Sequence, residues 1–197
     1  MNSVAFWDFA ASIPQSVSEV CRSHERCFGI KLEWQPRTDG GAWAKRNWRG
    51  VPGICYTGET DTCQTGRMEA PQNVLYDETG GEFIFRQPRS EEELRQVIYA
   101  GMVDPFDEYG FDGHRRWTVV SVRQWWKDRQ RVVKWIEKYA DYPEWHCHEY
   151  GKQQQPVALA EFQLHLHHEL AYFLRTFNFF LDNGRCSKAD DRLPDLD

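Results

Sequence analysis

From Ser90 onward, apolar residues recur with the three- to four-residue spacing of amphipathic helices. A capping-box pattern at Ser90 and Glu93 predicts the start of the first helix, and Asn183-Gly184 is a strong stop signal for the last. The pattern predicts three helices, over residues 90 to about 102, 121 to about 140, and 157 to about 181.

The first 88 residues follow a different pattern. They begin with two short predicted helices, residues 4–12 and 16–27, separated by Pro14, which we expect to break the helix. Gly, Pro and Thr then become frequent. Residues 74–76 and 83–85 are apolar or aromatic and flank a Gly-rich turn, so that Asn73–Arg86 is predicted to be a β-hairpin.

These elements predict an α+β fold with a predominantly helical body and a small antiparallel β-sheet or hairpin region in the first half. We expect one compact domain over residues 1–182, with the final helix at its centre. Its three parts are a helical 1–29, a β- and loop-rich 30–88 and a helical 89–182. Residues 183–197 are predicted to form a flexible tail.

The composition favours a folded protein. Hydrophobic residues make up 41% of the chain and aromatic residues 15%, with nine tryptophans, and intrinsic disorder requires far fewer aromatics. Neither a signal peptide nor a membrane span is recognisable, so we expect a cytoplasmic protein with no membrane contact. The six cysteines are expected to be reduced, with a Cys55–Cys63 bridge as the least improbable exception.

Charge is segregated along the chain. Residues 90–112 carry seven acidic side chains and one basic, whereas residues 113–138 carry eight basic and two acidic, in a protein whose net charge is only −6. Segregated charge is informative about partners rather than about chemistry.

On a helical projection, five basic residues of the 121–140 helix fall within about 80° of one another, opposite an apolar arc. We call this set the basic stripe; it comprises Arg123, Lys127, Arg131, Lys134 and Lys138. It is either a solvated outer face or a site for phosphates or an acidic protein surface. Arg129 projects into the apolar arc instead, and we expect a buried or half-buried carboxylate partner, such as Glu161 or Glu169 of the last helix.

The acidic block offers two interpretations. It either neutralises the basic stripe within the monomer, or faces outward and mimics nucleic acid in the groove of a partner. The acidic block comprises Glu91, Glu92, Glu93, Asp104, Asp107, Glu108 and Asp112.

Two further motifs suggest other functions. A tryptophan- and arginine-rich loop has the alternation that single-stranded nucleic-acid binding uses, although the acidic pI of about 5.7 argues against a dedicated binder. This Trp/Arg loop comprises Trp43, Lys45, Arg46, Trp48 and Arg49.

On the last helix, Glu161, His165 and His168 share one face, which suggests a site for zinc or another divalent transition metal and thus a metal-dependent hydrolase.

No nucleophile motif, phosphate-binding loop or dinucleotide fingerprint is present, so enzymatic activity is not favoured. We expect a non-enzymatic binding protein that docks on a larger protein or nucleoprotein complex through charged and aromatic surfaces. One concrete hypothesis is an inhibitor encoded by a phage or mobile element that acts on host defence, comparable to an anti-CRISPR protein. It follows from size, acidity and the lack of a catalytic signature. The metal-dependent hydrolase and the nucleic-acid-binding protein are the alternatives.

Overall fold

The computed structural model describes residues 9–37, 41–142 and 155–197, and about half of the chain is helical. The predicted α+β class is confirmed, because helices dominate and the strands form two small antiparallel pairs. The chain divides into two compact units, and whether they form one domain stays a prediction. Within the described ranges, the first unit covers residues from 9 to 113 and the second covers residues from 114 to 197.

The first unit contains both strand pairs. The predicted hairpin is present as β2 (Val74–Tyr76) and β3 (Glu82–Ile84), with Leu75 opposite Phe83. A second pair, β1 (Tyr56–Thr57) with β4 (Tyr109–Gly110), joins the β- and loop-rich region to a segment that follows α4 in sequence. The side chains of both hairpin strands are buried, because the pair lies within the core of this unit.

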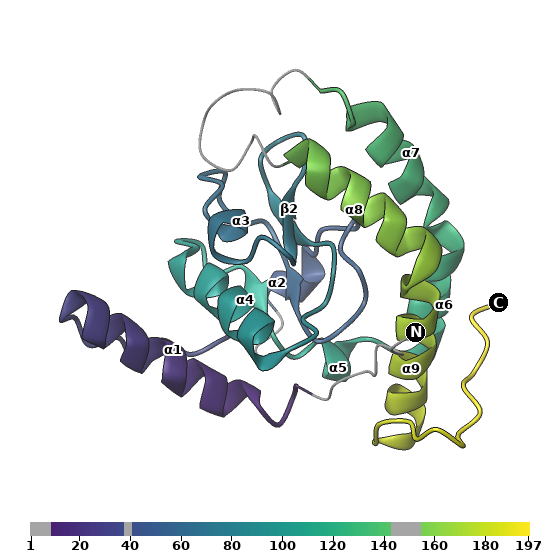
Figure 1. The fold of residues 1–197 in the computed structure, drawn as a ribbon, viewed down its shortest axis with the longest axis horizontal. Coiled ribbons are helices and arrows are strands. Elements are labelled where there is room, and N and C mark those ends of the chain that lie inside the picture. The colour runs from purple at the N-terminus through teal and green to yellow at the C-terminus, as the bar shows by residue number, and fades with distance from the viewer. Residues whose placement is uncertain (1–8, 38–40, 143–154) are drawn as a thin grey trace. The chain divides into compact units, whose positions relative to one another are not determined.

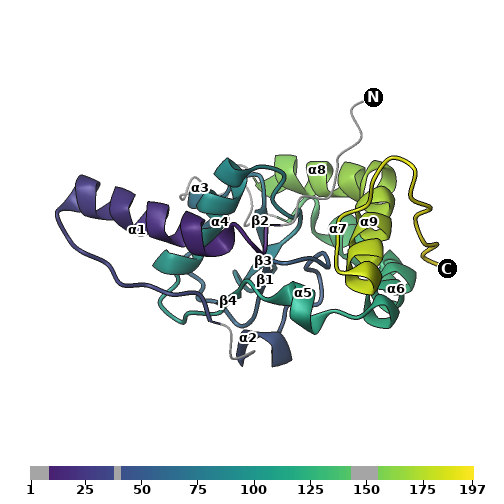
Figure 2. The ribbon, with the colours of Figure 1, turned by 90° about the horizontal axis from the view of Figure 1, so that it is seen from below.

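Helices surround these strands. Figure 2 shows α2 (Gly41–Ala44) and α3 (Gly66–Glu69) on opposite sides of them, and α3 also packs against α4 (Glu91–Val103). The Ser90 hydroxyl accepts a hydrogen bond from the Glu93 amide at 3.2 Å, as the predicted cap requires.

Helix α1 (Ile13–Phe28) packs against α4 and starts earlier than predicted. Pro14 lies in its first turn, where the absent N–H has no helical partner to lose, so this proline begins the helix instead of breaking it. Gly29 ends α1 in the left-handed conformation, with φ of 69°. The predicted helix over residues 4–12 lies largely outside the described residues.

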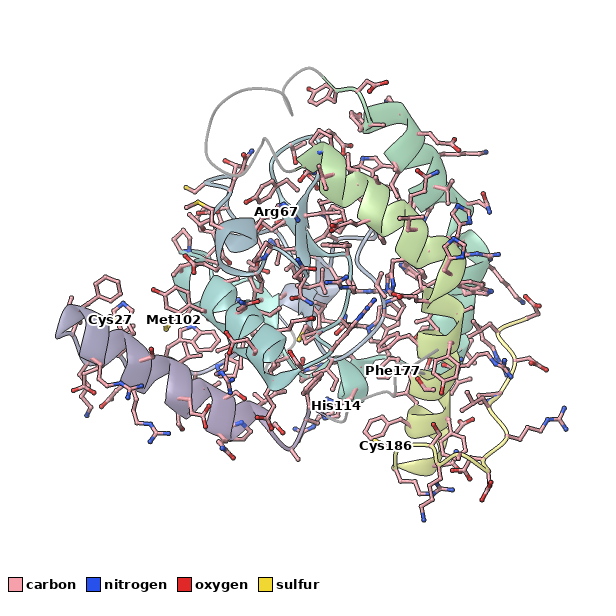
Figure 3. The ribbon with its side chains drawn as sticks, in the orientation of Figure 1. Cys27, Arg67, Met102, His114, Phe177 and Cys186 are labelled. Carbon is pink, nitrogen blue, oxygen red and sulfur yellow. The ribbon has the colours of Figure 1, made fainter. Side chains whose placement is uncertain are left out.

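Two buried polar side chains hold loops to this core. The Gln87 amide donates to the carbonyls of Val51 and Cys55 at 3.0 and 2.8 Å and accepts from the Cys55 amide at 3.0 Å. Arg67, labelled in Figure 3, donates from α3 to the Val74 carbonyl of β2 at 3.0 Å. Buried polar groups that find hydrogen-bond partners in this way specify positions that apolar packing alone leaves open.

The second unit contains two antiparallel helical arms (Figure 1). The first arm consists of α6 (Val119–Asp128) and α7 (Gln130–Tyr139), and the second of α8 (Gln155–His168) and α9 (Leu170–Asn183). Helix α6 packs against α9 and α7 against α8. The short α5 (Gly113–Arg116) precedes them in sequence. Each arm was predicted as one helix and is interrupted once, at Arg129 and at Glu169.

The described cysteines are free thiols, so the Cys55–Cys63 bridge is not formed: Cys55 is buried whereas Cys63 is exposed. Cys27 is exposed on the last turn of α1 (Figure 3). None of the helices in the described ranges is long and apolar enough to cross a membrane.

Candidate functional site

The basic stripe is divided between two helices: α6 carries Arg123 and Lys127, and α7 carries Arg131, Lys134 and Lys138. Thr118 caps α6 by accepting from the Ser121 amide at 3.1 Å, and the Ser121 hydroxyl accepts from the Thr118 amide at 2.9 Å. This reciprocal cap fixes where the helix starts and therefore which face is buried. The buried side chains of the two helices are Val122, Trp125, Val132, Val133, Trp135 and Ile136.

The cations of the stripe are accessible. Lys127, Arg131, Lys134 and Lys138 are exposed, and Arg123 is half-buried because its Nε donates to the Asp195 carbonyl at 3.0 Å. Among the described residues, Lys127 and Lys134 have no ion pair or side-chain hydrogen bond. Their charges therefore remain available to a partner.

Arg129 does not have the carboxylate partner that the sequence predicted. Its guanidinium lies 3.8 Å from the centre of the Trp126 ring, and its Nη1 donates to the Trp126 carbonyl at 2.8 Å. That carbonyl also accepts a hydrogen bond from the Arg129 amide at 3.3 Å. This bond spans three residues instead of the four of an α-helix, so the turn is tighter and α6 ends there. The interruption changes the helical phase, so Arg129 is half-buried at the bend and not in the middle of an apolar face.

The acidic block lies in the first unit, and its exposed members are Glu91 and Glu92 at the start of α4. Both pair with Arg95, at 4.0 and 2.9 Å, and Arg95 also pairs with Glu19 of α1 at 3.0 Å. Much of their charge is therefore compensated within this unit, and they also suit the α4 dipole.

The other acidic residues are largely committed to the fold. The Asp104 carboxylate is buried and accepts from the Glu108 amide at 2.7 Å, and buried Asp112 accepts from the Tyr56 hydroxyl at 2.6 Å. Glu93 accepts from the Arg89 amide at 3.0 Å. This placement differs from the expected outward-facing surface, because Asp104 and Asp112 cannot contact a partner without unfolding their loops.

Glu108 and Asp107 are half-buried. Glu108 lies 3.6 Å from the guanidinium of Arg37, and Asp107 has a φ of 54°, in the left-handed region that aspartate tolerates in tight turns. These two residues shape the loop between α4 and β4.

The Trp/Arg loop stacks its arginines on its own tryptophans. Arg46 lies 4.3 Å from the centre of the Trp43 ring, and Trp43 also meets the Tyr56 ring edge to face. The indoles of Trp43 and Trp48 are half-buried. Lys45 pairs with Glu59 at 2.7 Å. Part of the aromatic surface and of the cationic charge that single-stranded nucleic acid would use is therefore engaged within this unit.

Arg49 is a structural residue. It is buried, lies 4.4 Å from the centre of the Trp48 ring, and pairs with Asp77 and Glu78 of the hairpin turn at 3.4 and 2.6 Å. A buried guanidinium with two carboxylate partners holds the 47–49 segment to the hairpin.

The residues of the suggested metal site are not arranged as ligands. His165 is buried and its Nδ1 lies 3.2 Å from the Glu169 carboxylate, whereas His168 is exposed and Glu161 half-buried. Within the described part of the chain, no group of three His, Cys, Asp or Glu side chains is placed to hold a metal ion. The neighbouring His146-Cys147-His148 lies outside the described residues.

One strongly perturbed carboxyl group, that of Glu82, was not recognised from the sequence. Glu82 of β3 is buried, and accepts from the Tyr109 hydroxyl at 2.5 Å and the Gly66 amide at 2.7 Å. Burial raises the pKa of Glu82 to about 7, against the lowering effect of these two hydrogen bonds, and the charges of Asp61 and Asp104 raise it further.

Glu82 joins three segments of the first unit. Its backbone amide donates to the Thr60 hydroxyl at 2.7 Å and its carbonyl accepts from the Thr57 hydroxyl at 2.6 Å. The neighbouring Tyr76 hydroxyl donates to the Gln64 carbonyl, and burial raises the pKa of Tyr76 as well. Perturbed carboxyl groups are also found at active sites, but Glu82 and Tyr76 are inaccessible and satisfied internally, which indicates a structural role.

In comparisons with protein-family models, with curated proteins and with solved structures, the chain matches none.

Proposed function

We propose that this protein is a non-enzymatic, cytoplasmic binding protein that docks on a larger protein or nucleoprotein complex through the basic stripe of α6 and α7. The observation that supports this proposal most directly is the state of Lys127 and Lys134. Both side chains are exposed, and neither has an ion pair among the described residues.

Electrostatics explains why such a face suits a partner. Like charges on adjacent helical turns repel one another, and an acidic surface relieves this repulsion when it binds. Exposed charges add little to the stability of a monomer but accelerate and orient association. A partner with an acidic patch, or with accessible phosphates, therefore fits the stripe.

In its most concrete form, the proposal is a small inhibitor that a phage or another mobile element encodes and that docks on a host defence complex, in the manner of an anti-CRISPR protein. Small size, acidic net charge and segregation of charge support this form. In the mimicry version, Glu91 and Glu92 are the accessible carboxylates.

The proposal is tested by affinity capture with three tagged, full-length proteins. These are the wild type, Lys127→Glu/Lys134→Glu, and a control with the same charge change on the other unit, Arg22→Glu/Lys31→Glu. We expect a partner that the wild type and the control retain and that the stripe variant loses. Capture should weaken as the salt concentration rises from about 50 to about 300 mM, because screening reduces the range of electrostatic interactions.

Nuclease treatment of the lysate separates the kinds of partner. Loss of capture after nuclease would assign the stripe to nucleic acid, and competition by DNA or RNA for the captured target would favour mimicry. Equal capture by the wild type and the stripe variant would contradict the proposal.

A further inference from the structure

Residues 193–195 are bound to the second unit through their backbone. The Arg175 guanidinium of α9 donates to the Pro194 carbonyl at 2.9 Å and to the Leu193 carbonyl at 3.1 Å, and Arg123 of α6 donates to the Asp195 carbonyl at 3.0 Å. Figure 1 shows this part of the chain running back beside α9. Two arginines from two packed helices thus bind three consecutive carbonyl groups.

One apolar side chain anchors the same segment. Leu196 is buried, with 5% of its surface exposed, whereas its neighbours Asp195 and Asp197 are exposed. A bidentate pair between Arg185 and Asp191, at 2.7 and 2.9 Å, closes the preceding turn. An extended backbone held by hydrogen bonds, with one side chain inserted, is the way in which many proteins bind a peptide.

The segment does not fill the groove that holds it. An open hollow of about 550 Å³ lies beside it, lined by Arg123, Phe179, Asp182, Asn183 and Arg192 as well as by residues 193–195 and Asp197. Asp195 also places its carboxylate 3.6 Å from the Arg175 guanidinium, so the groove already accepts one carboxylate of an extended segment and has room beside it.

We propose that the groove between α6 and α9 is a binding site for an extended acidic segment of a protein partner, with a leucine-like side chain between two carboxylates, and that residues 193–197 occupy it as an internal competitor. This inference rests on the proposed function in one respect, because Arg123 belongs to both the basic stripe and the groove.

Residues 193–197 compete strongly with any external peptide because they are tethered to the groove. A tethered segment acts at an effective concentration in the millimolar range, so an external peptide of the same sequence cannot compete until the tether's anchor is removed. Replacing buried Leu196 by Asp or by Gly removes the anchor and leaves both arginines in place.

The test uses full-length proteins and a fluorescent peptide of residues 190–197, capped at both ends. We expect Leu196→Asp and Leu196→Gly to bind this peptide at least about tenfold more tightly than the wild type, in fluorescence anisotropy. Adding Arg175→Ala should abolish the gain, and a peptide with the Leu196→Asp change should not bind. Faster trypsin cleavage after Arg192 reports release of the segment, and circular dichroism reports the fold.

Two results would overturn the inference. One is unchanged cleavage after Arg192 in both Leu196 variants, which would show that Leu196 does not hold the segment. The other is faster cleavage after Arg192 in the Leu196 variants, together with peptide binding that is no tighter than that of the wild type. Peptide binding should be unaffected by Lys127→Glu/Lys134→Glu, so failure of the groove and failure of the stripe are distinguishable.

Discussion

The Arg129 guanidinium lies 3.8 Å from the centre of the Trp126 ring, three residues earlier in the chain, and donates to the carbonyl of the same tryptophan. This contact accompanies the bend between α6 and α7. Because it involves no carboxylate, truncating Arg129 leaves no buried charge unpaired.

Arg129→Ala should therefore destabilise the protein by about 2 kcal/mol, the sum expected for a partly exposed cation–π contact and one hydrogen bond. Urea unfolding of the single variants and of the double variant with Trp126→Leu measures the part due to the ring. A loss of several kcal/mol would instead indicate the buried ion pair that the sequence suggested.

Glu82 makes the stability of the protein depend on pH. Its pKa in the folded state, about 7, lies above the ordinary glutamate value of 4.5, so the folded protein binds the proton more tightly than the unfolded chain. The resulting stabilisation is complete below pH 4.5 and is lost as the pH rises through 7. The difference amounts to about 3 kcal/mol by proton linkage.

Glu82→Gln should remove this contribution, so that the gap in unfolding free energy between wild type and variant changes by about 3 kcal/mol between pH 4.5 and pH 8. Tyr109→Phe removes a hydrogen bond that lowers the Glu82 pKa. This variant should therefore lose the stabilisation by Glu82 at a higher pH than the wild type does. Parallel stability curves for wild type and Glu82→Gln would contradict this account.

Arg49 and Arg46 are close in sequence but should differ in their importance. Arg49→Met removes the cation that Asp77 and Glu78 share and should cost about 3 kcal/mol, whereas Arg46→Met removes exposed contacts with the ring and carbonyl of Trp43 and should cost less than about 1 kcal/mol. Urea unfolding measures both. Equal small effects, together with weakened binding of single-stranded DNA, would support a nucleic-acid role for the Trp/Arg loop.

Local patterns predicted the elements whose causes are local. The Ser90 cap acts over three residues, and the hairpin depends on a short turn, so both were recognisable. The interruption at Arg129 was not, because a side chain that bonds to a carbonyl three residues back leaves no mark on hydrophobic periodicity. The wrong phase then led to the wrong partner for Arg129.

Glu82 shows the opposite limit. Its partners Gly66 and Tyr109 lie 16 and 27 residues away, so its burial depends on contacts that only the fold creates. The burial of part of the acidic block also depends on contacts that only the fold creates, although its composition suggested an exposed surface. Pairing of β1 with β4 buries part of it, and the alternation of residue types in this loop gave no indication of that.

The basic stripe leads to a prediction about stability that is independent of any partner. Lys127 and Lys134 are exposed and unpaired among the described residues, so reversing both to Glu should change the free energy of unfolding by less than about 0.5 kcal/mol. Arg95→Glu is the contrasting variant, because Arg95 links Glu19 of α1 to Glu92 of α4 and its reversal places like charges together.

Thermal unfolding, followed by circular dichroism at low and high salt, compares the three proteins. We expect Lys127→Glu/Lys134→Glu to melt within about 2 °C of the wild type, and Arg95→Glu to melt several degrees lower, with partial recovery at high salt because screening weakens the new repulsion. A large drop for the stripe variant would mean that the basic stripe is neutralised by acidic residues of the same chain. The stripe would then be a structural ion-pair network, and its cations would not be free for a partner.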